Sequence, residues 1–287
     1  LIGTGGLLGG IAGSALVSET VKTYSSAPLI LLCLGLTAAI LFFSWRIDVL
    51  ARSREAAMAY REQPVQLEKV KWLSALDGAN MVVRSRYLIA IVAILALYEF
   101  CSQILDFQFS SVLAKAIVGG RDVQAYLGRL YLVTNILALL SQILLTTLLL
   151  RRSGPGAGLV VLPAAMCFAS GAFLLEPTLI IGSLLIIADN GLNYSINQTS
   201  REMLFVPTSA DAQYKARAFT NMFVQRLAKG AATVVSAAFI LIGVRWLSPI
   251  TLGITLGWIW LAILAGRRFR KLAGQKRSAS SELVTEG

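Results

Sequence analysis

The chain has 287 residues, a formal net charge of +11 and a mean hydropathy of +0.70, and 56% of its residues are hydrophobic. It contains no histidine, so the commonest general base and metal ligand is missing. This composition excludes an ordinary soluble domain. Eight apolar stretches follow along the chain, at 2–18, 28–45, 87–105, 131–150, 158–175, 179–196, 218–243 and 247–265. Most approach the ~20 residues that a helix needs to cross a bilayer. Because the runs are continuous rather than alternating, they predict an all-α membrane protein with eight transmembrane helices.

The first stretch is rich in small residues. These recur every four positions along two neighbouring stripes, Gly5, Gly9 and Gly13 beside Gly6, Gly10 and Ser14. Such stripes allow close approach of helices in a membrane, and the Lys-Ser/Thr ending of a phosphate-binding loop is absent. We therefore predict helix packing here, and we expect Gly9→Leu to destabilise the bundle. Because Leu1 already lies in an apolar stretch, we expect the chain to be a fragment whose N-terminal helices are missing.

The organisation along the chain suggests four parts, which are two helices in 1–45, a linker in 46–86, a six-helix bundle in 87–266 and a basic tail in 267–287. In the linker we predict amphipathic helices over Arg46–Tyr60 and Val65–Leu76, broken at Pro64, on the cytoplasmic surface. We predict short connections at 151–158 and 176–178, and a disordered tail. Three isolated cysteines, Cys33, Cys101 and Cys167, fit neither a disulfide framework nor a metal site. We expect no metal and no cofactor.

The basic residues are unevenly distributed between the predicted loops. If both ends are cytoplasmic, the inside segments carry 19 Lys and Arg and the outside segments carry five. This asymmetry follows the positive-inside rule, and it explains the net charge without a nucleic-acid partner. The expected surroundings are therefore lipid, with both ends on the cytoplasmic side of a membrane such as a bacterial inner membrane.

Polar side chains gather on single faces of several predicted helices. The third stretch carries Glu99, Gln103 and Asp106, the fourth carries Asn135, the sixth carries Asp189, Asn193 and Asn197, and the seventh carries Arg226 and Lys229. Ionisable groups at membrane depth are costly and usually functional. Together these stripes predict a hydrated cavity that holds a solute near the midplane, whereas aromatic residues are taken as packing.

A structural alternative stays open for each of these residues. Asp189 or Glu99 can pair with Arg226 or Lys229 and hold helices together. If the two cations instead meet a solute, they favour a phosphate- or carboxylate-bearing one, and we expect Arg226→Ala and Lys229→Ala to abolish its uptake. Arg201 and Glu202, near the cytoplasmic end of their helix, are candidates for a gate ion pair.

One stretch resembles a known family. Residues 189–229 include Tyr194-Ser195-Ile196, Arg201-Glu202-Met203, Phe205-Val206-Pro207 and the pair Lys215 and Arg217. They resemble the plastid and rickettsial type of ATP/ADP translocase, a branch of the major facilitator superfamily, and in particular its bacterial relatives. The glycine-rich opening looks like the fifth helix of that family, and Leu150 to Gly154 resembles a degenerate form of the superfamily's loop motif after the eighth helix. The chain departs from the translocases at Asn197 to Ser200.

The resemblance implies a major-facilitator-type bundle in which the chain supplies helices five to twelve of twelve. It implies that the seventh helix (Glu99, Gln103, Asp106) and the tenth helix (Asp189, Asn193, Asn197) line the central cavity, and that the fifth and eighth helices pack across the interface between the halves. We therefore predict a secondary active transporter, not an enzyme, that carries an anionic, nucleotide-like solute by alternating access.

Three alternatives remain at this point. One is a proton-coupled carrier of another solute or of lipid, whose transport depends on pH and on Glu99 or Asp106 but not on Arg226. Another is a membrane-embedded enzyme that uses Asp106 and Asp189, for which no nucleophile motif is present. The third is a receptor or assembly domain, which predicts a dry cavity and tolerance of Asp189→Ala.

Overall fold

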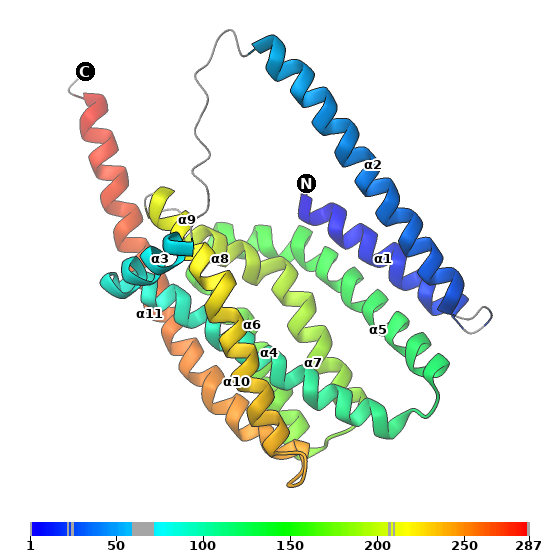
Figure 1. The fold of residues 1–287 in the computed structure, drawn as a ribbon. Coiled ribbons are helices and arrows are strands. Elements are labelled where there is room, and N and C mark those ends of the chain that lie inside the picture. Colours follow the sequence, from blue (N-terminus) through cyan, green and yellow to red (C-terminus); the bar gives the residue numbers. More distant parts are fainter. Residues whose placement is uncertain are drawn as a thin grey trace.

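The computed structural model describes residues 2–21, 23, 26–58, 72–205, 208 and 210–285, and throughout these ranges the regular structure is helical (Figure 1). The first part of the bundle contains α1 (Ile2–Thr20), α2 (Ser26–Met58), α3 (Trp72–Arg84), α4 (Arg86–Ala116), α5 (Gly120–Leu140), the π-helical segment η1 (Ser141–Thr146) and α6 (Thr147–Leu175). The second part contains α7 (Leu179–Leu192), the π-helical η2 (Asn193–Asn197), α8 (Gln198–Leu204), α9 (Ala210–Phe219), the π-helical η3 (Thr220–Val224), α10 (Gln225–Ala238), the 3₁₀ turn η4 (Val244–Leu247) and α11 (Ser248–Thr285).

Helix α4 forms the centre of the bundle. It packs against α7, α10 and α11, while α6 packs against α7 and α11. Its side chains Ile91, Ile94 and Ile104 have no exposed surface. Tyr98 lies edge-on to the buried Trp258 of α11, with 5.9 Å between the ring centroids. The apolar run from 87 to 105, which predicts a membrane-spanning helix, lies within α4, and α4 extends further, to Ala116.

Six helices of the described chain are long and apolar enough to cross a membrane, at Ala27–Leu50, Arg86–Ala116, Gly120–Leu144, Gly156–Leu175, Leu179–Leu204 and Val244–Phe269. The chain is thus a multi-pass membrane protein. The other two predicted segments are helical but are not among these six. Helix α1 has 19 residues and is rich in glycine, and α10 carries Arg226 and Lys229. Each runs beside one of the six, α1 on α5 and α10 on α4.

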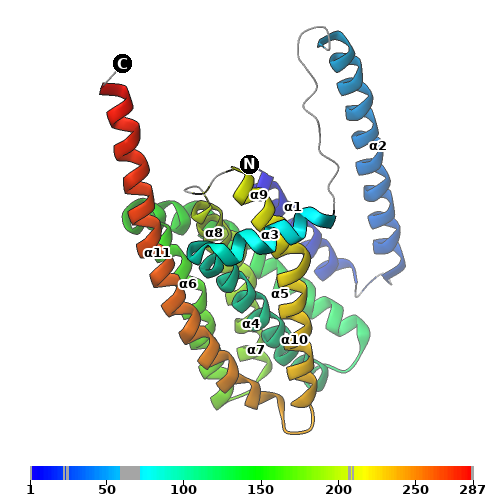
Figure 2. The same ribbon diagram turned by 60° about the vertical axis from the view of Figure 1, so that its left-hand side comes forward.

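The helix predicted over Arg46–Tyr60 is present as far as Met58, but as the end of α2 rather than as a separate helix. Helix α2 continues without a break from Ser26 to Met58, across the predicted boundary at 45, and it stands apart from the bundle (Figures 1 and 2). The predicted break at Pro64 lies outside the described residues. The prediction of a disordered tail is wrong, because α11 runs on to Thr285 as one helix. Residues after Arg267 are mostly helix formers and contain no proline, so the preceding helix propagates through them.

The predicted connections are also resolved. The link at 176–178 is confirmed, and the Thr178 side chain caps α7 by accepting a hydrogen bond from the Ile181 amide at 3.4 Å. At 151–158 the helical geometry is interrupted at Gly154, whose φ of 74° and ψ of 177° are accessible to glycine. The chain therefore turns at one residue where a longer loop was expected.

Only one of the two glycine stripes of α1 is in contact with another helix. A Cβ on Gly10 would lie 2.9 Å from Asn135 of α5, whereas Gly5, Gly9 and Gly13 have no such neighbour within 4 Å in the described structure. On α5, a Cβ on Gly128 would lie 2.8 Å from the backbone nitrogen of Ser18. Close packing of α1 is thus real, but the expectation that Gly9→Leu disrupts it is wrong because Gly9 faces away from α5.

We expect Gly128→Ala to lower the thermal unfolding temperature of the detergent-solubilised protein. The new methyl group meets backbone atoms that cannot move without shifting α1, and such overpacking costs about 1–3 kcal/mol. The matched control is Gly9→Ala, which adds the same group in open space and is expected to leave stability unchanged or slightly raised. Equal unfolding temperatures for the two variants would contradict the contact.

Candidate functional site: two adjoining cavities between the helices

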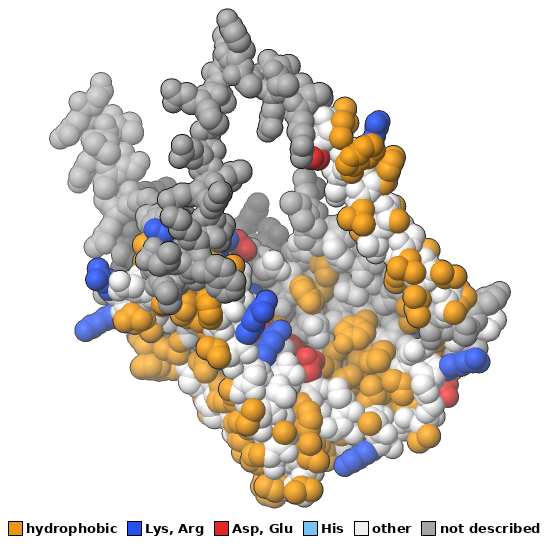
Figure 3. Space-filling view, in the orientation of Figure 1, with side chains coloured by type: hydrophobic (Ala, Val, Ile, Leu, Met, Phe, Trp, Pro, Cys, Tyr) orange, Lys and Arg blue, Asp and Glu red, His pale blue; other side chains and the backbone are white. Residues whose placement is uncertain are grey.

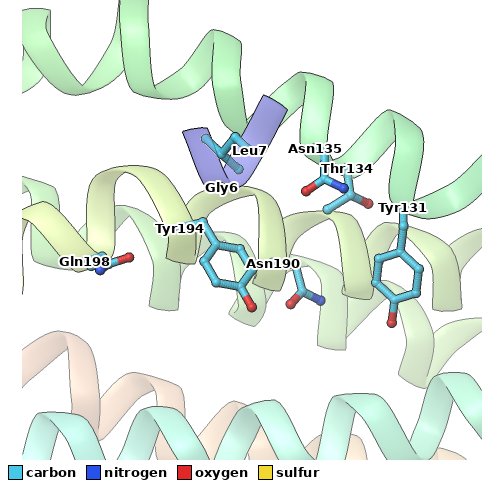
Figure 4. Close-up of a pocket in the computed structure, with 8 residues that line it drawn as sticks. All are labelled: Gly6, Leu7, Tyr131, Thr134, Asn135, Asn190, Tyr194 and Gln198. Carbon is cyan, nitrogen blue, oxygen red and sulfur yellow. The ribbon is translucent and has the colours of Figure 1, made fainter. Parts of the chain in front are cut away.

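A cavity of about 420 Å³ lies between α1, α5 and the continuous helix α7–η2–α8. We call it the tyrosine cavity. Its lining residues are Gly6, Leu7, Tyr131, Thr134, Asn135, Asn190, Tyr194 and Gln198 (Figure 4). None of them is charged. The polar ends of Tyr131, Asn190 and Tyr194 point to the same side in Figure 4.

Helix periodicity explains how these residues come together. Tyr131, Thr134 and Asn135 are spaced i, i+3 and i+4 on α5, so they share one face. On the facing helix, Asn190, Tyr194 and Gln198 repeat every four residues. Gly6 and Leu7 of α1 complete the wall. The predicted site residue Asn135 lies in the lining of this cavity, and its amide forms no hydrogen bond within the described chain.

A second cavity of about 200 Å³ lies towards α9 and α10. We call it the arginine cavity, because Arg201 of α8 and Arg217 of α9 line it together with Glu202, Gln225 and Gln198. Gln198 lines both cavities, so the two adjoin at this residue. The arginine cavity is the more polar of the two because guanidinium, amide and carboxylate groups surround it.

Two guanidinium atoms in the arginine cavity are buried without a hydrogen-bond partner in the described structure, Arg201 Nη1 and Arg217 Nε. The Arg201 guanidinium lies 5.2 Å above the ring centroid of Tyr98. Arg217 lies 4.8 Å above the ring centroid of Phe205, and its Nη2 donates to Glu202 Oε2 at 3.3 Å. Buried donors without partners are unfavourable, so they favour an anion in this space.

The candidate gate pair is therefore arranged differently from the prediction. Glu202 forms its ion pair with Arg217 rather than with Arg201, its neighbour in sequence. Adjacent residues of a helix do not face each other, which prevents the predicted pair from forming. The Arg217–Glu202 pair joins α8 to α9, and its side chains are 40% and 58% exposed, so solvent weakens the pair.

Deeper in the bundle, acidic groups from two helices gather around α4. Asp189 is only 1% exposed, and its Oδ2 accepts a hydrogen bond from Ser102 Oγ at 2.5 Å. Its Oδ1 has no hydrogen-bond partner in the described structure. Lys229 of α10 pairs with Glu99 of α4, with 3.3 Å between Nζ and Oε2. In the space-filling view of Figure 3, basic and acidic side chains lie together near the middle of the face that is shown.

The other predicted site residues line neither of the two cavities. Asn197 is fully buried and donates to Asn193 Oδ1 at 2.9 Å, within their own helix. Gln103 and Asp106 are half-buried and line neither of the two cavities. Arg226 is exposed and forms no ion pair within the described chain. Within that part, no group of three or more His, Cys, Asp or Glu is placed to hold a metal ion.

Sequence reasoning missed most of the tyrosine cavity. Tyr131 and Tyr194 were assigned to packing, but both line the cavity and keep a large exposed fraction, 40% and 54%. The stripe at Asn190, Tyr194 and Gln198 runs beside the predicted stripe that begins at Asp189, one residue further along the chain. These three side chains have polar ends and recur every four residues, and this repeat is the sequence signal that predicts a cavity-lining face.

We expect Ser102→Ala to lower the free energy of unfolding by about 1–3 kcal/mol, because the buried Asp189 carboxylate loses a hydrogen bond. Chemical denaturation in detergent micelles measures this loss. Ser110→Ala on the exposed side of the same helix is the control. A Ser102→Ala variant as stable as that control would contradict the importance of the hydrogen bond.

The family model of the TLC ATP/ADP transporters matches residues 13–179, from the middle of α1 to the first residue of α7. The chain belongs to the TLC ATP/ADP transporter family. This is a family of transporters and not of enzymes, which resolves the enzyme alternative. The match ends before residues 189–229, so it supports the family independently of the motifs found there. No solved structure matches the chain.

Proposed function

We propose that this chain is part of a secondary active transporter that carries a phosphate-bearing, nucleotide-like anion by alternating access. The observation that carries the proposal is the arginine cavity, in which Arg201 Nη1 and Arg217 Nε are buried donors without partners, in a member of a nucleotide transporter family. Phosphate oxygens are strong acceptors for guanidinium groups. Glu99, Gln103, Asp106, Asn135, Asp189, Asn193, Asn197, Arg226 and Lys229 remain the proposed substrate pathway.

The architecture that we propose is a major-facilitator-type bundle in which all eight predicted segments cross the membrane, with α1 and α10 among them. Packing of α1 on α5 through Gly10 and Gly128 supports it, because the fifth and eighth helices of that superfamily pack against each other across the interface. Helix α2 exposes Ile30, Leu31 and Leu41 at 59–68%, and we propose lipid and preceding helices of the same polypeptide as their partners.

The orientation that we propose places both ends in the cytoplasm of a bacterial cell. Figure 1 places the N- and C-terminal ends of the described chain and the far end of α2 at the same end of the bundle. In the sequence, 46–86 and 267–277 carry most of the basic residues outside the apolar stretches, and the positive-inside rule assigns such segments to the cytoplasmic side.

In the proposed cycle, the pair Arg217–Glu202 acts as the cytoplasmic gate. A phosphate that enters the arginine cavity can replace Glu202 as the partner of Arg217, which releases α9 from α8. A solute can drive a conformational change only if it binds one state more tightly than the other. The π-helical segments η2 and η3 flank this place, and such segments are frequent at functional sites.

We expect the full-length protein in proteoliposomes to take up radiolabelled ATP when ADP is present inside, and we expect unlabelled nucleotides to compete better than glutamate. The comparison separates phosphate-bearing from carboxylate-bearing solutes. Uptake that glutamate inhibits as strongly as ADP, or no uptake of any nucleotide, would contradict the proposal.

A second candidate is proton-coupled transport of another solute or of lipid. The observation that favours it is the Asp189 carboxylate, which is buried at membrane depth beside Ser102. Under this alternative, uptake depends on an imposed pH gradient and is lost in Asp189→Asn, whereas Arg201→Gln has no effect. The same proteoliposomes with and without the gradient distinguish the two candidates.

A further inference from the structure

The two cavities adjoin but differ in chemistry. The tyrosine cavity has no charged lining residue and presents two phenol rings and two asparagine amides. The arginine cavity presents two guanidinium groups. Gln198 belongs to both, so the two cavities are neighbours at this residue. A ligand that fits this pair has an uncharged aromatic part joined to an anionic part.

The tyrosine cavity is suited to a planar ring. Tyr131 and Tyr194 come from facing helices, and their rings retain exposed surface on which an aromatic ligand can stack. The Asn135 amide has no partner in the described structure, and asparagine can form two hydrogen bonds to the N6 and N7 edge of adenine. The volume of about 420 Å³ lies within the range of small-molecule sites.

The arginine cavity is suited to the anionic part. The Arg201 guanidinium lies over the ring of Tyr98, and its Nη1 remains without a partner in the described structure. Arg217 is held by Phe205 and by a largely exposed ion pair with Glu202. Two planar guanidinium groups supply forked donors that match phosphate oxygens.

We propose that a nucleotide binds across both cavities, with its base between Tyr131 and Tyr194 and its phosphates against Arg201 and Arg217. Gln198 lies at the junction of the two parts. This inference rests on the proposed function and adds to it the location of the base and of the phosphates. It also assigns base recognition to residues that sequence patterns place among packing side chains.

The test measures binding of three unlabelled ligands in competition with radiolabelled ATP on the full-length protein in detergent. ATP carries both parts, tripolyphosphate carries only the anionic part, and adenosine carries only the aromatic part. For the wild type we expect ATP to bind more tightly than either partial ligand.

Variants in the two cavities are expected to separate the partial ligands. Tyr194→Ala weakens ATP and adenosine about tenfold, the usual effect of losing one stacking partner, and leaves tripolyphosphate unchanged. Arg201→Gln weakens ATP and tripolyphosphate about tenfold or more and leaves adenosine unchanged. The matched controls are Tyr214→Ala on the exposed side of α9 and Arg245→Gln in η4, both outside the cavities. If Tyr194→Ala unfolds, Tyr194→Leu keeps the apolar volume and removes the ring.

Two results would overturn this assignment while leaving the proposed function intact. One is a Tyr194→Ala or Tyr194→Leu variant that weakens tripolyphosphate as much as ATP. The other is an Arg201→Gln variant that weakens adenosine as much as ATP. A wild-type protein that binds neither ATP nor tripolyphosphate would overturn the proposed function itself.

Discussion

Lys229→Ala is expected to abolish uptake and to destabilise the protein by about 2–3 kcal/mol, because it leaves the Glu99 carboxylate without a partner at membrane depth. The two side chains join α10 to α4 at 3.3 Å, and the Glu99 side chain is only 11% exposed. Radiolabelled nucleotide uptake in proteoliposomes and thermal unfolding in detergent measure the two effects. Arg226 has no such partner in the described chain, so Arg226→Ala is expected to reduce uptake without loss of stability.

The double variant Glu99→Gln with Lys229→Ala separates a structural role from a transport role. The double variant has no unpaired Glu99 carboxylate at membrane depth, so we expect its unfolding temperature to return towards that of the wild type. We expect uptake to remain lost, because the proposed solute pathway still lacks one of its cations. Recovery of both stability and uptake would show that the pair only holds α4 and α10 together.

Gly266→Leu is expected to cause a large loss of stability. A Cβ on Gly266 of α11 would lie 2.7 Å from the Cα of Gly156 on α6, and a Cβ on Gly156 would lie 2.9 Å from the Cα of Gly266. The two backbones touch, so no side chain can rotate away to make room. Since α6 and α11 share an extensive interface, a side chain here separates both helices, at a cost of about 3 kcal/mol or more.

The control for this substitution is Gly257→Leu, which lies on the same helix and has no neighbour within 4 Å in the described structure. It adds the same apolar volume without meeting α6. Thermal unfolding of both variants in one detergent gives the comparison. Similar unfolding temperatures for Gly266→Leu and Gly257→Leu would contradict the direct contact between α6 and α11.

Sequence patterns predicted the helices well, because in lipid the apolar runs and the backbone hydrogen bonds decide the secondary structure. They were less informative about helix ends. Helix α2 runs past the predicted boundary at 45 because Ala, Arg and Glu continue the helix, and α11 does the same after Arg267. Apolar content shows where a membrane helix is buried in lipid, but it does not show where the helix stops.

The candidate site was predicted only in part. The stripe of Asp189, Asn193 and Asn197 was recognised by its polarity, but Asp189 and Asn197 are buried, the first beside Ser102 of α4. The neighbouring face, with Asn190 and Tyr194, lines the tyrosine cavity. A rotation of about 100° per residue separates the two faces, and the sequence contains no signal for which of them faces the cavity. Packing against α1 and α5 decides it.

The most direct test of the account asks whether the tyrosine cavity is open to water and is occupied by nucleotide. The background has Cys33, Cys101 and Cys167 replaced by alanine. Asn190→Cys places a thiol in the cavity lining, whereas Leu184→Cys places one on the outer surface of the same helix, where we propose that it faces lipid. The rate of reaction with a membrane-impermeant thiol reagent is measured in proteoliposomes with and without ATP. We predict that Asn190→Cys reacts, that ATP slows this reaction, and that Leu184→Cys does not react. No reaction at Asn190→Cys, or a rate that ATP leaves unchanged, would contradict a hydrated nucleotide site between these helices.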